Sequence, residues 1–271
     1  MRRRTVLAGL TLASFSGCLG DREDDGRTST QPEGTPTHIP EETERERLVI
    51  GETATFDDGT SLTVTNPTIQ KSIIAAHSQF LAIERKDGLQ FVVVDVEGDA
   101  DFEPSSFVLE RNGDIEEPPQ TQQAIRGVVR SCEGTCIAIS VEAEPEDSVA
   151  VAFRVNDVSR AVWALDDTTV TMIAAVPDLR LQKATLTDQG DGLGIEFTVE
   201  NVGNRDGVFR ALVVPAWVAD VESPVGFEVA KNETVTETIT PSEIQLLEPD
   251  EATFVGEPTE DTRYFSVESE S

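Results

Sequence analysis

The sequence predicts an all-β protein. From residue 47 onward, short apolar runs recur between turn-forming residues, as expected for strands joined by tight turns. Several runs alternate apolar and polar residues with the two-residue period of a half-buried strand, whereas residues 91–94 are apolar throughout and fit a central strand. A sheet with one apolar face has to bury that face against another layer, so the runs predict β-sandwiches.

The clearest alternation lies in residues 149–155 and 195–199. In the first stretch every second residue is Val or Phe, and in the second Ile, Phe and Val alternate with Glu and Thr. Asp-Asp-Gly at 57–59, Asn-Gly-Asp at 112–114 and Asp-Gly at 191–192 are typical turns between such strands. The elements are therefore predicted to be mostly antiparallel.

The length beyond residue 46 suits two domains. One strand-like run ends near residue 176 and a new one begins at residue 179, so residues 47–175 and 177–271 are predicted to form two separate β-sandwiches. Only residues 70–85 leave the element type open. Their apolar residues fall near helical spacing, but a long strand entering a loop fits equally well.

The N-terminus, residues 1–17, predicts a signal peptide, with a basic start and a ten-residue apolar stretch. Spanning a membrane takes roughly 20 apolar residues, so this stretch is no permanent anchor. Arg3 and Arg4 with the residues after them resemble the twin-arginine export motif, although a basic start also fits the general secretory route. Residues 15–18 resemble a lipobox, which implies a lipid-modified Cys18 and an exterior, membrane-anchored location.

Cysteine usage agrees with lipidation, because Cys18, Cys132 and Cys136 are the only cysteines. Modification of Cys18 leaves an even pair, four residues apart around a glycine. Outside the cell a disulfide is favoured for this pair over two free thiols or a metal or redox role, since zinc sites normally need four N or S ligands. So short a loop would fix only a local turn.

The composition is strongly acidic. The chain has 51 Asp and Glu against 21 Lys and Arg, and removal of residues 1–17, which hold three Arg and no acid, leaves a net charge of −33. Such a charge repels nucleic acid and anionic membrane surfaces. At about 1 M salt the Debye length is only ~3 Å, which removes most of the self-repulsion. With only four Lys, the balance resembles that of proteins from extremely halophilic archaea.

Residues 18–46 predict a disordered tether. They are acidic and rich in Thr and Pro, with almost no apolar side chains to bury. A flexible chain of this length spans on the order of 30 Å. High charge is a signature of disorder in general, but the strand-like runs after residue 46 argue against disorder there.

Short motifs carry two family resemblances. Residues 50–52, 91–96 and 145–153 resemble the immunoglobulin-like domain of unknown function common in secreted lipoproteins, and residues 197–204 and 247–251 resemble the adhesion-related immunoglobulin-like domain of prokaryotic surface proteins. The resemblances imply two immunoglobulin-like sandwiches in adhesion, envelope structure or binding of an unidentified surface or membrane protein. A shared fold does not fix a function. The alternative is an accessory lipoprotein that delivers a solute or metal to a membrane partner.

The sequence predicts neither an enzyme nor a cofactor. His38 lies in the tether and His77 is the only other histidine, so neither a histidine metal cluster nor a Ser-His-Asp triad is easily built. No Gly-rich phosphate loop or nucleophile elbow occurs.

Two further motifs are candidate sites. Glu97, Asp99, Asp101 and Glu103 alternate after the predicted central strand and form a candidate Ca²⁺ loop. An ordinary solvated acidic loop is favoured, because the glycine and bidentate Glu of an EF-hand are missing. Asn232 begins a usable N-glycosylation sequon, a tripeptide that also occurs often by chance.

Overall fold

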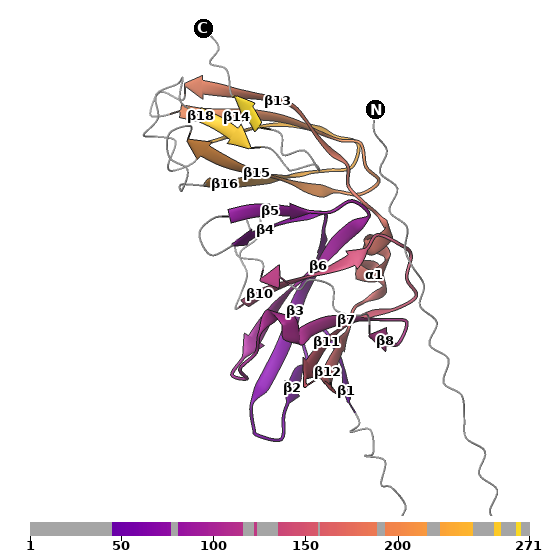
Figure 1. Ribbon diagram of the computed structural model, residues 1–271. Coiled ribbons are helices and arrows are strands. Elements are labelled where there is room, and N and C mark those ends of the chain that lie inside the picture. The colour runs from indigo at the N-terminus through magenta and orange to yellow at the C-terminus, as the bar shows by residue number, and fades with distance from the viewer. Residues whose placement is uncertain are drawn as a thin grey trace, which may run out of the picture. The chain divides into compact units, whose positions relative to one another are not determined.

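The computed structural model describes residues 45–76, 81–115, 122–123, 135–156, 158–188, 193–215, 223–240, 252–255 and 264–266. The predicted signal peptide and almost all of the tether, with Arg3, Arg4 and Cys18, lie outside these ranges. The described chain consists mainly of strands, with one α-helix and one 3-10 helix (Figure 1). The all-β fold class is therefore confirmed.

Two five-stranded sheets form the first sandwich. One sheet has the order β2 (Thr53–Thr55), β3 (Ser61–Gln70), β6 (Leu89–Gly98), β10 (Thr135–Glu142) and β9 (Gln122–Gln123). The other has the order β1 (Glu46–Val49), β12 (Val158–Ala164), β11 (Val149–Val155), β7 (Phe107–Arg111) and β8 (Asp114–Ile115). β1 runs parallel to β12, and every other neighbouring pair is antiparallel.

This strand order is that of an immunoglobulin domain. β3 corresponds to the A strand of such a domain, and β6 to β12 correspond in chain order to B, C, C′, D, E, F and G. With these letters the two sheets read A-B-E-D and G-F-C-C′. A hairpin of β4 (Ser72–Ala76) and β5 (Leu81–Arg85) is inserted between A and B. The described part of residues 70–85 is thus strand, which decides the question that the sequence left open.

The second sandwich repeats the same connectivity. One sheet has the order β13 (Leu179–Asp188), β14 (Leu193–Asn201) and β17 (Thr234–Ile239), and the other has the order β16 (Ser223–Val229), β15 (Gly207–Pro215), β18 (Ala252–Val255) and β19 (Tyr264–Ser266). Lettered in chain order, they read A-B-E and C′-C-F-G. Residues 42–271 form one compact unit, so separate folding of the two predicted domains stays a prediction.

Each sandwich has its own apolar core. Trp163 is fully buried in the first core, and its indole Nε1 donates a hydrogen bond to the carbonyl oxygen of Glu52 at 2.9 Å. In the second core, Ile195, Phe197 and Val199 are completely buried, as their alternation predicted. The polar residues between them lie on the other face of β14.

β11 differs from its predicted pattern, because both of its faces are buried. Ala150 and Ala152 lie on the face turned away from the first core, yet they are 6% and 0% exposed. Arg45 and Arg47 reach Glu110 on β7 at 3.0 and 2.7 Å. Since β12 and β11 lie between these residues in the sheet, the long arginine side chains cross this face and cover it.

One helix interrupts the strands. α1 (Asp167–Ala174) begins after Asp166, whose carboxylate accepts a hydrogen bond from the backbone N of Thr169 at 2.8 Å. Val170 and Ile173 lie on one side of the helix and enter the first core. The short apolar run predicts a strand here, and the capping aspartate is the signal in the sequence that favours a helix instead.

Arg205, in the turn between β14 and β15, ties the second sandwich to the first. Its guanidinium donates hydrogen bonds to the carbonyl oxygens of Ala175 and Ile69, both at 2.8 Å, and to Oε1 of Gln90 at 2.7 Å. The Gln90 amide donates in turn to Ile173 O. Burial lowers the pKa of Arg205, because its acceptors are neutral groups that do not offset the loss of water.

The turn that carries Arg205 is held in place by Asn201. The buried Asn201 amide donates to the carbonyl oxygens of Arg205 at 2.8 Å and Val229 at 3.0 Å, and its Oδ1 accepts from the backbone N of Gly203 at 3.0 Å. A small apolar contact, in which Leu212 packs with Ile74 of the inserted hairpin, adds to the joint. The two sandwiches are thus connected by hydrogen bonds as well as by the chain.

Candidate functional site

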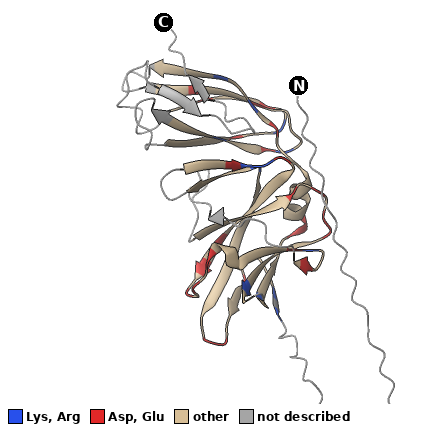
Figure 2. Ribbon diagram, viewed as in Figure 1, with Lys and Arg blue, Asp and Glu red and all other residues tan. Residues whose placement is uncertain are grey.

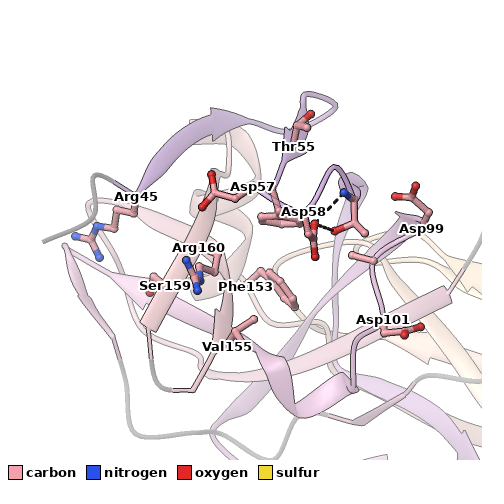
Figure 3. A pocket seen from close by; sticks show the side chains of 13 residues that line it. Arg45, Thr55, Asp57, Asp58, Asp99, Asp101, Phe153, Val155, Ser159 and Arg160 are labelled. Carbon is pink, nitrogen blue, oxygen red and sulfur yellow. Dashed lines mark hydrogen bonds between the residues drawn. The ribbon is translucent and has the colours of Figure 1, made fainter.

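The candidate site is a cavity of about 580 Å³ at one end of the first sandwich (Figure 3). The turn between β2 and β3, the loop after β6 and the turn between β11 and β12 surround it. In immunoglobulin letters the last two are the B–C and F–G loops, which form the binding end of variable domains. The lining residues are Arg45, Thr55, Phe56, Asp57, Asp58, Thr60, Asp99, Ala100, Asp101, Phe153, Val155, Ser159 and Arg160.

The turn between β2 and β3 is fixed by Asp58. Its Oδ1 accepts hydrogen bonds from Thr60, at 2.9 Å from the backbone N and at 2.6 Å from the hydroxyl. The hydroxyl bond is the main reason that the pKa of Asp58 is lowered. Gly59 supplies the positive φ of 85° that the turn requires. The carboxylate therefore stays charged in a fixed place on the rim.

The loop after β6 is attached to β3 in a similar way. Asp99 Oδ1 accepts hydrogen bonds from the backbone N of Ser61 at 2.6 Å and from the Ser61 hydroxyl at 3.1 Å, and these bonds lower the pKa of Asp99. The preceding residue, Gly98, has a φ of 151°, and a Cβ there would lie only 2.1 Å from Ser61 O. Only glycine allows the two strands to approach so closely.

The arginine side of the cavity depends on a β-bulge. The register between β11 and β12 shifts after Phe153, so that Arg154 pairs with Ser159 while Phe153 pairs with Ala161. Arg160 is the extra residue, and bulges of this kind redirect a side chain at the end of a sheet. Figure 3 shows Arg45 and Arg160 on one side of the cavity and Asp99 and Asp101 on the other, with Phe153 between them.

This geometry suits recognition of a charged surface. Four aspartates and two arginines line the cavity around an aromatic base formed by Phe56 and Phe153, whose ring centroids are 5.5 Å apart. One of the arginines, Arg45, is already paired with Glu110. The volume falls within the range of small-molecule sites, but those sites are usually mostly apolar and enclose their ligand. Here six of the thirteen lining residues are charged. Among the described lining residues, no histidine or cysteine stands beside Ser159 to activate it as a nucleophile.

The predicted Ca²⁺ residues lie near this cavity, but they are not assembled into one metal site. Glu97 is the last residue but one of β6 and is exposed, Asp99 is bound to Ser61, and Asp101 lines the cavity. Glu103 precedes the short 3-10 helix η1 (Pro104–Ser106) and accepts from the Ser105 hydroxyl at 3.4 Å. In the described ranges, no three His, Cys, Asp or Glu side chains are placed to hold a metal ion. The solvated acidic loop stays the favoured interpretation, with the Ca²⁺ loop as its untested alternative.

The described member of the predicted cysteine pair lies on β10. Cys136 is disulfide-bonded and buried, and its Sγ lies 3.5 Å from Oδ1 of the fully buried Asp95. A disulfide sulfur has no hydrogen to donate, so this short distance is a contact and not a hydrogen bond. Cys132 lies outside the described residues, and its pairing with Cys136 stays a prediction.

The predicted glycosylation site occupies an exposed turn. Asn232 has a φ of 60° between β16 and β17, and Thr234 of the same sequon is also exposed. This position is compatible with modification, which stays a prediction. His38 and His77 lie outside the described residues.

Figure 2 shows Lys and Arg positions on β1 and β12, while many Asp and Glu positions lie at turns. No described helix is long and apolar enough to cross a membrane.

Comparison of the chain with protein-family models, curated proteins and solved structures gives no match. The two family resemblances therefore stay predictions, and the function has to be argued from the site.

Proposed function

We propose that this chain is a lipid-anchored protein of the cell surface that acts without catalysis, as a protein-interaction or envelope-structure module. The charged cavity at the loop end of the first sandwich is the observation that carries the proposal. Its rim is preorganised, since Asp58 and Asp99 are each fixed by two hydrogen bonds. Preorganised loops lose little conformational entropy when a partner binds.

The place where the chain enters the first sandwich supports a partner near the membrane. Arg45 lines the cavity and lies at the C-terminal end of the predicted tether, residues 18–46. If Cys18 carries the lipid, a partner bound at this end lies within roughly 30 Å of the lipid surface, the span of the tether. A membrane protein or an envelope layer close to the membrane is then within reach.

The joint between the sandwiches supports a role in positioning. Arg205 makes three hydrogen bonds across the joint. A force on one sandwich, including one exerted by a bound partner, is therefore transmitted to the other sandwich. A simple chain of independent domains would need no such contact.

The alternative function, delivery of a small solute or metal, is favoured by one observation, the cavity volume of about 580 Å³. Its charged lining argues against a neutral solute, for which an apolar enclosure is usual. This alternative therefore requires that the delivered solute is a charged small molecule.

The proposal is tested by affinity capture of the tagged full-length protein from its own membranes at native salt. We compare the wild type with Asp101→Lys at the cavity and with a matched control, Asp114→Lys, at the exposed start of β8 in the same sandwich. The proposal expects a specific protein partner that Asp101→Lys loses and the control keeps. Equal capture by both variants would exclude the loop end, and co-purification of a transporter with a bound solute would favour the alternative.

A further inference from the structure

Among the residues that the structure describes, no strand pairs with one edge of the second sandwich, whereas β9 covers the corresponding edge of the first. In the first sandwich, the E strand β10 has β6 on one side and the D strand β9 on the other, with Ile137 opposite Gln123. In the second sandwich, the E strand β17 is the last strand of its sheet within the described ranges. Only residues 230–233 separate β16 from β17, so the chain has no segment at that point to form a D strand.

The start of this edge is rigidly placed. In the turn before β17, the backbone N of Glu233 donates to Ala230 O at 3.1 Å, and the backbone N of Asn232 donates to Asn201 O at 3.0 Å. The backbone N of Asn201 donates in return to Glu233 O at 2.9 Å. β17 is therefore a fixed template rather than a frayed end.

The side chains of β17 leave the second core half covered. Val235 and Ile239 pack against this core but are only partly buried. Glu237 lies between them, directly opposite the fully buried Phe197, and is exposed. Opposite residues of antiparallel strands share a face, so a carboxylate is placed on the core side of an edge strand.

A charge in this position prevents pairing between two copies of the chain. Edge strands commonly avoid self-association through such inward charges. In an antiparallel pair of two β17 strands centred on residue 237, with Val235 opposite Ile239, Glu237 would stand opposite its own copy, which is destabilising, and each mature chain carries a net charge of −33. A strand with a basic residue at that position meets neither obstacle.

We propose that β17 is a docking edge for an extended segment of a partner protein, which adds as the missing D strand and places a Lys or Arg beside Glu237. Backbone hydrogen bonds along the six residues of β17 would provide affinity, and the alternate side chains would provide specificity. Apolar residues on either side of the basic one would cover Val235 and Ile239. This inference rests on the proposed interaction role and adds a second contact site to the loop end.

The test uses two synthetic hexapeptides, TVTKTV and TVTETV, titrated into the full mature protein at the lowest KCl concentration at which it stays folded, because about 1 M salt screens most charge interactions. Hydrogen exchange of the β17 amides reports strand addition. We expect the Lys peptide to bind about tenfold more tightly than the Glu peptide, since one opposite-charge pair is gained and one like-charge pair avoided. Glu237→Lys should reverse the order, whereas Glu196→Lys, on the other face of β14, should keep it.

Two results would overturn the proposal: no protection of β17 amides by either peptide, or an unchanged peptide preference in Glu237→Lys. The contact site at the loop end of the first sandwich is tested separately. Asp101→Lys should bind both peptides as the wild type does, so a failure of strand addition leaves the capture experiment at the loop end unaffected.

Discussion

Replacement of Arg205 by Ala should weaken the joint between the sandwiches. The change removes three hydrogen bonds and leaves Ala175 O, Ile69 O and Gln90 Oε1 without that donor. At about 1 kcal/mol for each bond, and more where the donor is charged, the cost is on the order of 2–4 kcal/mol. A protein of this size loses about 2–4 °C of melting temperature per kcal/mol, so the expected decrease is on the order of 5–15 °C.

The assay is a thermal melt of the mature protein in about 2 M KCl, with hydrogen exchange of residues 202–206. Arg205→Lys should recover only part of the loss, because one ammonium does not reproduce the planar fork of donors. The control is Arg180→Ala, which removes an exposed ion pair with Asp178 and should change stability by less than about 1 kcal/mol. If Arg205→Ala melts at the same temperature as this control, the hydrogen-bonded joint contributes nothing and the reasoning is refuted.

Three further outcomes are expected. Cys18→Ser should move the protein from the membrane fraction to the medium, and unchanged membrane retention would show that another anchor exists. The melting temperature should rise between about 0.1 and 3 M KCl, because counterions screen the crowded carboxylates, and a flat profile would remove the halophilic interpretation. Gly98→Ala should lower the free energy of unfolding by about 2–3 kcal/mol, because the added Cβ clashes with Ser61 O. The control, Gly59→Ala, is also at positive φ but in open space, and should cost only about 1 kcal/mol. Equal losses of stability in the two variants would contradict the close approach at Gly98.

Strand periodicity made the two cores predictable. Residues 195–199 alternate cleanly because only one face of β14 meets the core, and the burial of Phe197 follows from that pattern. The second buried face of β11 was not predictable, because it depends on Arg45 and Arg47, about 100 residues away, lying across Ala150 and Ala152. From the sequence alone, an arginine is expected to be a solvated surface charge. Only the order of the strands in the sheet shows which residues its side chain covers.

The candidate site was predicted only in part. Asp99 and Asp101 stand out in the sequence as alternating acids, but that pattern does not indicate that the Asp99 carboxylate fixes a loop to Ser61. Arg160 and Phe56 carry no local signal, because a register shift and a distant turn bring them to the same cavity. Arg205 was likewise invisible in the sequence, since its acceptors come from three separate segments of the chain.

The lipid-anchored, outward-facing position of the two sandwiches is tested most directly by labelling intact cells with a membrane-impermeant amine reagent and then determining the mass of the N-terminal peptide of the purified protein. We expect Lys231, which is exposed, or another lysine to be labelled without lysis, and the N-terminal peptide to begin at Cys18 with the added mass of a lipid. Labelling only after lysis, or an unmodified N-terminus at another residue, would contradict the proposed location and function.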